Sequence, residues 1–471
     1  MSLSADVAAT LQPGFVGAYL PAWIERAHGA GLVSVCLYGD NVPDAGGLAA
    51  LCAALHDRMP GVLLAVDEEG GDVTRLHYPA GSPAVGNAVL GRLDDEGTTR
   101  DAAATIGEEL TAYGIGLDLA PVVDVNSSPD NPVIGVRSFG AEPHGVGRHG
   151  AAWVEGLQST GVLACAKHFP GHGDTVVDSH HGLPRIGVPL DVLRARELAP
   201  FRAVVAAGVA SVMTSHIVVE ALDPERPATF SPAVLAVLRD ELRFTGVIVS
   251  DALDMAGASA QTGIPDAAVR ALTAGVDLLC LGSRTTEERY AGVHAAVLDA
   301  ARSGRLAPER VTEAAERVRS LAARSATSLS RPSVTKTGPT LQKLPAEVVA
   351  RAFRVTDEAR RWISRPGPVC VVQVDSVANL AVGQVAWGPA ALGAVVEESA
   401  LPPGARVAVV ARAVGPGHLA HAVVQRLRNA GHDVVLVECG WPRGGADLET
   451  FGGSPAVARA LLAVLRGEVS A

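Results

Sequence analysis

Over its first 325 residues the chain repeats one pattern, in which an amphipathic helix ends at a glycine and a short apolar strand follows at once. The glycine-strand runs begin at Ala30, Pro60, Tyr113, Thr160, Ala207, Thr245 and Ala274. Glycine suits the left-handed position that ends a helix, and continuous apolar strands between helices are typical of a parallel sheet covered on both faces. With a first strand expected near Val7 to Leu11, the pattern predicts the strands of a (β/α)8, TIM-like barrel. A doubly wound open sheet is the alternative, because the repeat alone fits both.

The pattern breaks at residues 326–345, a polar segment that contains prolines and reads as a linker. We therefore assign residues 1–325 to the barrel and residues 346–471 to a smaller α/β domain of αβα-sandwich type. In that second domain, apolar runs at Val369 to Val374, Val407 to Val410 and Val434 to Val437 alternate with helical stretches.

Composition and charge exclude several classes of partner. A formal net charge of −11 argues against binding to nucleic acid or to an anionic membrane surface. The N-terminal sequence shows no signal-peptide pattern and no apolar run has the length of a membrane span, so we expect a cytoplasmic protein. We expect it to be a monomer or a weak homo-oligomer. The cysteines are scattered, which predicts reduced thiols; they are Cys36, Cys52, Cys165, Cys280, Cys370 and Cys439.

Polar residues stand at the carboxyl ends of five different predicted strands. They are Asp67, Asp124, Lys167-His168, Ser215-His216 and Ser250-Asp251. Barrel enzymes assemble their active sites at this edge, from the ends of several strands. One such residue is explained by a helix cap or a loop hydrogen bond, but five in the same relative position predict an active site.

The stretch from Lys167 to Pro184 carries the densest chemistry, with one lysine, four histidines and two aspartates. Its prolines and glycines predict a loop. In an extended segment residues two apart face the same side, so Asp178 can orient His180 and raise its basicity for proton transfer. If the chain cleaves glycosidic bonds, the best carboxylate to attack the anomeric carbon is Asp251, which follows an apolar strand. Its alternative role is the N-cap of the next helix.

Taken together, four motifs resemble the ordered signatures of glycoside hydrolase family 3. The motifs are D-E-E-G-G-D-V-T-R-L from Asp67, N-P-V-I-G-V-R-S-F-G from Asn131, K-H-F-P-G-H-G-D-T-V-V-D-S-H from Lys167 and V-I-V-S-D-A-L-D-M from Val247. More narrowly, they resemble its bacterial β-N-acetylglucosaminidase branch (NagZ-type, two-domain form), which acts in peptidoglycan recycling. The resemblance covers residues 5 to 325, and the match of the downstream domain is weak.

The resemblance implies a retaining exo-β-N-acetylglucosaminidase, or β-hexosaminidase, that needs no cofactor or metal. Asp251 would be the nucleophile, and Asp178 with His180 would form the acid/base dyad. The substrate would be a saccharide with a terminal N-acetylglucosamine, derived from cell wall or chitin. The positions that match substrate-contacting residues are Asp67, Arg137, Lys167, His168, Met255 and His216.

Two departures from the family pattern bear on these roles. Ala252 stands where the family often has a second aspartate after Asp251, which removes a neighbouring carboxylate and leaves the nucleophile. His181 follows His180 directly and is an alternative acid/base; we prefer His180 because Asp178 lies two residues away.

Four other functions compete with this interpretation. A metal-dependent hydrolase would draw ligands from the histidines and aspartates of residues 168–181, but no H-E-x-x-H or similar spacing is present. A sugar-binding protein without turnover is a second possibility. A β-glucosidase or β-xylosidase of the same family generally lacks the D-S-H loop. A phosphorylase is the fourth, because a histidine acid/base adds no negative charge against an incoming phosphate.

Overall fold

The computed structural model describes residues 1–175, 182–260, 262–329, 343–375 and 381–471, and the chain divides into two compact units. The first unit comprises Met1–Glu68, Glu96–Pro132 and Ala141–Thr340, and the second comprises Glu69–Asp95, Val133–Gly140 and Leu341–Ala471. Most of the predicted linker, residues 330–342, lies outside the described residues. The domain boundaries predicted from the sequence stay predictions.

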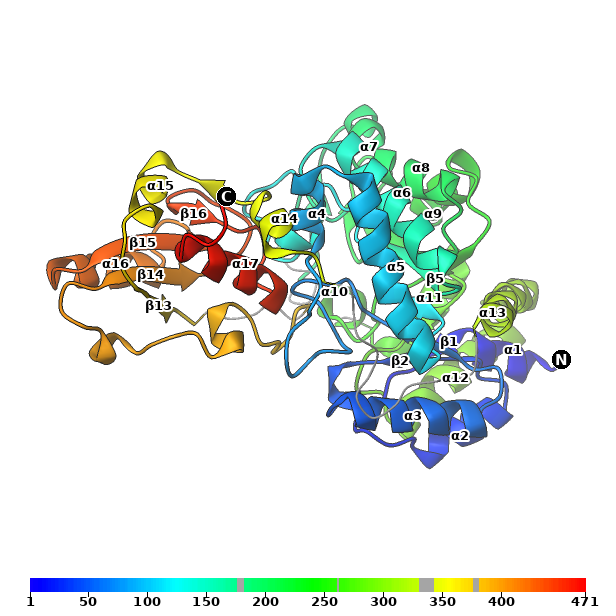
Figure 1. The fold of residues 1–471 in the computed structure, drawn as a ribbon. Coiled ribbons are helices and arrows are strands. Elements are labelled where there is room, and N and C mark those ends of the chain that lie inside the picture. The colour runs from blue at the N-terminus through cyan, green and yellow to red at the C-terminus, as the bar shows by residue number, and fades with distance from the viewer. Residues whose placement is uncertain (176–181, 261, 330–342, 376–380) are drawn as a thin grey trace. The chain divides into compact units, whose positions relative to one another are not determined.

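Parallel strands form the centre of the first unit (Figure 1). Among its described residues these strands are β1 (Leu11–Gln12), β2 (Ser34–Leu37), β3 (Leu63–Val66), β4 (Leu117–Asp118), β5 (Leu163–Phe169), β7 (Ser211–Thr214), β10 (Val247–Val249) and β11 (Leu279–Cys280). Six pair in the order β10-β7-β5-β4-β3-β2, and β1 pairs with β11. Backbone hydrogen bonds from Cys36 N to Pro13 O (3.0 Å) and from Ser250 N to Leu278 O (2.9 Å) join the two sheets. The predicted TIM-like barrel is confirmed.

Helices connect these strands. They are α2 (Ala22–Gly29), α3 (Ala45–Arg58), α5 (Glu96–Tyr113), α6 (Pro143–Ser159), α7 (Leu190–Arg196), α8 (Leu198–Ala206), α9 (Pro232–Ala236), α10 (Ala256–Ser259) and α11 (Ile264–Ala274), followed after β11 by α12 (Glu287–Arg302) and α13 (Pro308–Ser328). Glycine ends α6 as the repeat predicts: Gly161 has a φ of +92° one residue after the C-cap. A small sheet of β6 (Arg185–Ile186), β8 (Val218–Val219) and β9 (Asp223–Pro227) is added outside the barrel strands.

The start of the chain differs from the prediction. Residues Leu3–Ala9 form a helix, α1, and only Leu11 of the run expected to be the first strand lies in β1. The Ser2 side chain accepts a hydrogen bond from Ala5 N and so caps the helix. Alanine and leucine, the best helix formers, dominate this segment, and local propensity therefore decides its structure.

The second unit contains a five-stranded sheet with the order β12-β16-β15-β14-β13. Its strands are β12 (Arg354–Val355), β13 (Val369–Gln373), β14 (Arg406–Ala411), β15 (Asp433–Glu438) and β16 (Leu448–Glu449), and its helices are α4 (Asn87–Leu93), α14 (Ala346–Ala350), α15 (Asp357–Ile363), α16 (Leu419–Asn429) and α17 (Pro455–Leu465). Helix α16 packs on β14 and β15 (Figure 1). The three apolar runs predicted as strands are β13, β14 and β15, so the smaller α/β domain is confirmed.

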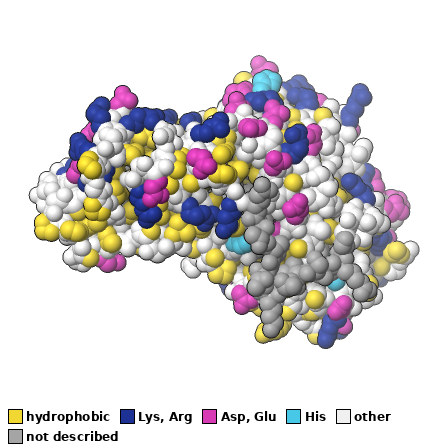
Figure 2. All heavy atoms as spheres, viewed as in Figure 1, with side chains coloured by type: hydrophobic (Ala, Val, Ile, Leu, Met, Phe, Trp, Pro, Cys, Tyr) yellow, Lys and Arg dark blue, Asp and Glu magenta, His cyan; other side chains and the backbone are white. Residues whose placement is uncertain are grey.

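Acidic and basic side chains are interspersed over the face shown in Figure 2. Within the described part of the chain, no helix has both the length and the apolar character needed to cross a membrane. All six cysteines are free thiols, five of them buried and Cys370 half-buried.

Candidate active site

Strand β5 carries a deeply buried positive charge of the site. It runs to Phe169, so Lys167 and His168 belong to the end of the strand and not to the predicted loop. Lys167 is 2% exposed, and its Nζ lies 2.6 Å from Oδ1 of Asp67, the first residue after β3. A buried ammonium group is stable only with a partner of opposite charge. Strands β3 and β5 lie on either side of β4, and their carboxyl ends bring this pair together, as the strand-end positions predict.

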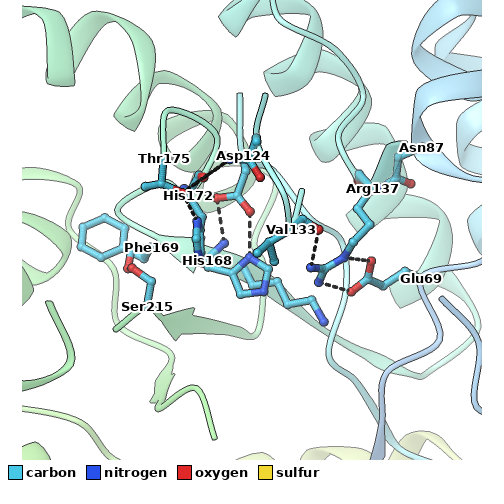
Figure 3. Close-up of polar contacts among 12 residues, drawn as sticks. Glu69, Asn87, Asp124, Val133, Arg137, His168, Phe169, His172, Thr175 and Ser215 are labelled. Atoms are coloured by element: carbon cyan, nitrogen blue, oxygen red, sulfur yellow. Dashed lines mark hydrogen bonds and ion pairs between the residues drawn. The ribbon is translucent and has the colours of Figure 1, made fainter. Parts of the chain in front are cut away.

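Asp124, six residues after β4, organises the turn that follows β5. Its carboxylate is fully buried; Oδ2 lies 2.7 Å from His168 Nδ1, and Oδ1 accepts the backbone N–H groups of His168 (3.2 Å) and His172 (2.7 Å), as Figure 3 shows. Burial alone would raise the pKa of Asp124, but His168 and these hydrogen bonds hold it below its ordinary value. The carboxylate therefore fixes His168 with its proton on Nδ1.

His172 is neutral in this arrangement. Its Nδ1 lies 2.8 Å from Thr175 Oγ1, and burial lowers its pKa to about 4. The Asn131 side chain donates to the His172 carbonyl (2.8 Å), which fixes the same turn from another loop. His172 thus supports the turn and is a poor source of protons at neutral pH.

Asp251 follows β10 and Ser250. It is half-buried, and its Oδ1 accepts a hydrogen bond from Ala252 N (2.7 Å). The next helix, α10, begins at Ala256 with Met255 at its N-cap position, so the alternative reading of Asp251 as that cap is wrong. The carboxylate is held at the end of a barrel strand, where a nucleophile is expected. Met255 itself is buried, 7% exposed.

His216, two residues after β7, is fully buried and contacts the turn that carries Asp251. Its Nε2 lies 3.0 Å from the Ala252 carbonyl, and its Nδ1 lies 2.9 Å from Thr229 Oγ1. Because a carbonyl only accepts, Nε2 carries the hydrogen of the first bond. These contacts make His216 a support of the Asp251 turn.

Arg137 belongs to the second unit. Its Nε and Nη2 donate to the two carboxylate oxygens of Glu69 (2.9 and 2.7 Å), and both side chains are about 5% exposed or less (Figure 3). The Arg137 carbonyl accepts a hydrogen bond from Asn87 Nδ2 (2.7 Å). A two-pronged pair of this kind fixes the plane of the guanidinium group.

Two predicted catalytic residues, Asp178 and His180, and the alternative His181, lie outside the described residues. In the part of the chain that is described, no cluster of three or more metal-binding side chains occurs.

Sequence reasoning assigned no role to Glu69 or Asp118, and it placed Asp124 at the end of a strand without giving it a specific role. Asp118 is fully buried and accepts the Glu68 N–H (2.9 Å), and burial raises its pKa well above the ordinary value. The position of Asp124 beyond an apolar strand indicated its importance. Glu69 is one of two adjacent glutamates, and the sequence does not distinguish them.

The sequence of the chain matches a known protein family. The family model described as "Glycosyl hydrolase family 3 N terminal domain" matches residues 21–321. Beta-hexosaminidase A of Pseudoalteromonas piscicida is 36% identical over 348 residues, which are 67% of this chain and 58% of that protein. Beta-hexosaminidase LpqI of Mycobacterium tuberculosis is 39% identical over 224 residues, 46% of this chain and 57% of that protein. The chain thus spans less than two thirds of these two curated relatives.

A solved structure covers the whole chain. It is described as a glycoside hydrolase family 3 beta-N-acetylglucosaminidase from Paenibacillus sp. str. FPU-7, with a TM-score of 0.85 and 28% sequence identity. The alignment includes 100% of this chain and 97% of that one, so the likeness extends over both units.

Proposed function

The chain belongs to glycosyl hydrolase family 3, and from this membership we propose that it is a retaining exo-β-N-acetylglucosaminidase. The substrate is a saccharide, derived from cell wall or chitin, with a β-linked N-acetylglucosamine at its non-reducing end. The observation that carries the proposal is the buried Lys167–Asp67 pair beside the Asp124-held His168. Fixed charged and imidazole groups at the ends of neighbouring barrel strands suit the recognition of sugar hydroxyls.

Each predicted site residue has a role in this proposal. Lys167, His168, Asp67 and Arg137 bind hydroxyls of the terminal sugar, and Met255 packs against the sugar. His216 contributes by holding the turn of the nucleophile.

The proposed reaction has two steps. In the first, the Asp251 carboxylate attacks the anomeric carbon, and the bond to the leaving oxygen breaks as His180 gives that oxygen its proton. In the second, His180 takes a proton from water, the water oxygen attacks the same carbon, and Asp251 leaves. Two inversions retain the β configuration. Asp178 orients the His180 imidazole and stabilises its protonated form.

The activity is tested by hydrolysis of nitrophenyl β-N-acetylglucosaminide beside the β-glucoside, β-galactosaminide and β-xyloside. We expect the N-acetylglucosaminide to have the highest kcat/KM and the free sugar to be the product with or without phosphate. A preference for the glucoside would move the chain to another activity of the family. Release of sugar 1-phosphate when phosphate is added would make it a phosphorylase.

The acid/base assignment is tested separately, with leaving groups of graded acidity. His180→Ala should be strongly impaired on a natural disaccharide, whose alkoxide needs a proton, and much less impaired in glycosylation by an acidic phenol that leaves unaided. The activity of Asp178→Asn should fall between that of wild type and that of His180→Ala. His181→Ala is the matched control, and its activity should stay near wild type. Pre-steady-state rates measure this. Equal losses across the series, or a larger loss for His181→Ala, would assign the proton to another group.

A further inference from the structure

The segment 69–95, which contains Glu69, is held along its length by the C-terminal part of the second unit. The Tyr78 hydroxyl accepts the Gln384 N–H (3.0 Å), and the Ser454 hydroxyl donates to the Ala84 carbonyl (3.0 Å). A Cβ on Gly81 would lie 2.3 Å from the Ala386 carbonyl oxygen, so the two backbones are in close contact. The segment is therefore packed as part of the second unit and not as a free loop.

A further contact of this segment is a buried ion pair between Asp72 and Arg412. Asp72 Oδ2 lies 3.2 Å from Arg412 Nη2, with side chains 5% and 12% exposed, and Asp72 Oδ1 accepts the Gly453 N–H (2.9 Å). The Arg412 guanidinium also lies over the Trp387 ring, 4.2 Å from its centroid. A Cβ at position 453 would lie 2.7 Å from Arg412 Nη2, so the backbone of Gly453 lies close against the guanidinium group. Arg412 is therefore fixed by charge, by stacking and by a close backbone.

A short rigid turn connects Asp72 to Glu69. Val73 N donates to Gly70 O (3.2 Å), and Gly70 and Gly71 take the positive φ values of +74° and +60° that the turn requires. A Cβ on Gly71 would lie 2.4 Å from the Gly86 Cα. The turn is thus packed directly against the residue before Asn87.

Two contacts connect this turn to Arg137, one through Glu69 before it and one through Gly86 and Asn87, which pack against Gly71. Glu69 holds the Arg137 guanidinium in a two-pronged pair, and Asn87 holds its carbonyl. A shift of the turn would move both supports together. A misplacement of about 1 Å in a binding group can cost about 100-fold in rate, so the position of this turn matters for catalysis if Arg137 binds the substrate.

We propose that Arg412 of the C-terminal domain is a positioning residue for substrate binding, acting through Asp72 and the 70–73 turn on the Glu69–Arg137 pair. The proposal rests on the proposed function, in which Arg137 binds the terminal sugar. It gives the C-terminal domain a part in catalysis without direct contact with the substrate.

The test compares three variants of the full-length enzyme. Arg412→Gln removes the charge that holds Asp72, and Asp72→Asn removes the partner charge while keeping an oxygen for the Gly453 N–H. The matched control is Arg426→Gln, which breaks an exposed arginine pair with Glu398 in the same unit. Arg412→Gln and Asp72→Asn should lower kcat/KM about tenfold or more, chiefly by raising KM, and Arg426→Gln should not change it. Should Arg412→Gln fail to fold, Asp72→Asn, which breaks the same ion pair, takes its place here and in the cycle with Arg137→Ala.

A double-mutant cycle with Arg137→Ala identifies the route of the effect. If Arg412 acts through Arg137, Arg412→Gln should cost less than about twofold once Arg137 is alanine. Full additivity of the two losses would overturn the proposal, as would wild-type kcat/KM in folded Arg412→Gln and Asp72→Asn enzymes.

The single Arg137→Ala enzyme separates this proposal from the proposed function. A loss of activity in Arg137→Ala without a loss in Arg412→Gln overturns the positioning role alone. An Arg137→Ala enzyme with unchanged kinetics overturns the role of Arg137 in binding and the positioning role with it.

Discussion

At the scale of single residues, the site depends on buried charges that stabilise one another. Lys167 is nearly inaccessible to solvent and has Asp67 as a partner at 2.6 Å. Asp67→Asn keeps the shape and removes the charge, which leaves the ammonium group poorly compensated. We expect the free energy of unfolding to fall by about 3 kcal/mol and kcat/KM to fall with it.

Urea denaturation followed by tryptophan fluorescence measures this loss. The control is Arg26→Gln, which breaks an ion pair with Glu287 in which both side chains are mostly exposed, so its stability should stay close to wild type. An Asp67→Asn protein as stable and as active as wild type would mean that Lys167 does not depend on this carboxylate.

Asp251 gives a second prediction at this scale. The described contacts give it no helix-capping role, so its replacement should affect chemistry and not folding. Asp251→Asn should lower kcat about 10⁴-fold with an unchanged unfolding midpoint. NMR of the first product released by the wild-type enzyme should show the β anomer. An α anomer as first product would contradict the role of Asp251 as nucleophile.

At the scale of elements, the junction of α7 and α8 supports the turn after β5. Arg196, the last residue of α7, pairs with Asp174 (2.6 Å) in that turn and with the next residue, Glu197 (2.5 Å). The Glu197 side chain is fully buried, and a Cβ on Gly171 would lie 2.7 Å from its Oε2. This oxygen has no hydrogen-bond partner among the described residues. The junction thus places an incompletely paired carboxyl group directly beneath the turn.

This carboxyl group predicts a pH dependence of stability. Burial raises the pKa of Glu197 to about 7, and Arg196 lowers it only in part. Because the folded-state pKa lies above the unfolded value near 4.5, the folded protein holds the proton more tightly, and stability is lost as pH rises towards 7. The stability of wild type minus that of Glu197→Gln should fall by about 3 kcal/mol between pH 4.5 and pH 7 and stay constant above. Urea midpoints at four pH values measure it, and a difference independent of pH would contradict the prediction.

At the scale of the whole molecule, the sequence predicted those features of the fold and the site that depend on local patterns. The barrel follows from seven glycine-strand runs, and the Lys167–Asp67 contact follows from two strand-end positions in a parallel sheet. The first strand was misplaced because β1 has only two residues, too few for a pattern, and because a capped alanine-rich helix precedes it.

Other features could not be predicted because they join distant parts of the chain. The Asp72–Arg412 pair links positions 340 residues apart, and the assignment of residues 69–95 and 133–140 to the second unit depends on such contacts. No periodicity or motif encodes which arginine meets which aspartate. The sequence pattern places a domain boundary near residue 325, whereas contacts decide which inserted segments pack with which unit.

The packing of residues 69–95 with the second unit predicts the effect of removing the C-terminal domain. A chain ending at residue 329 keeps the barrel strands and loses the partners of Asp72, Tyr78 and Ala84. Its amides in residues 69–95 should therefore exchange with solvent much faster than in the full chain, because local stability depends on packing. Amides of β2 and β3 serve as the internal control and should keep their protection, since their hydrogen bonds lie within the first unit. Hydrogen exchange with mass spectrometry compares the two chains. If residues 69–95 are equally protected in both, the barrel alone folds this segment, and the C-terminal domain is not its anchor.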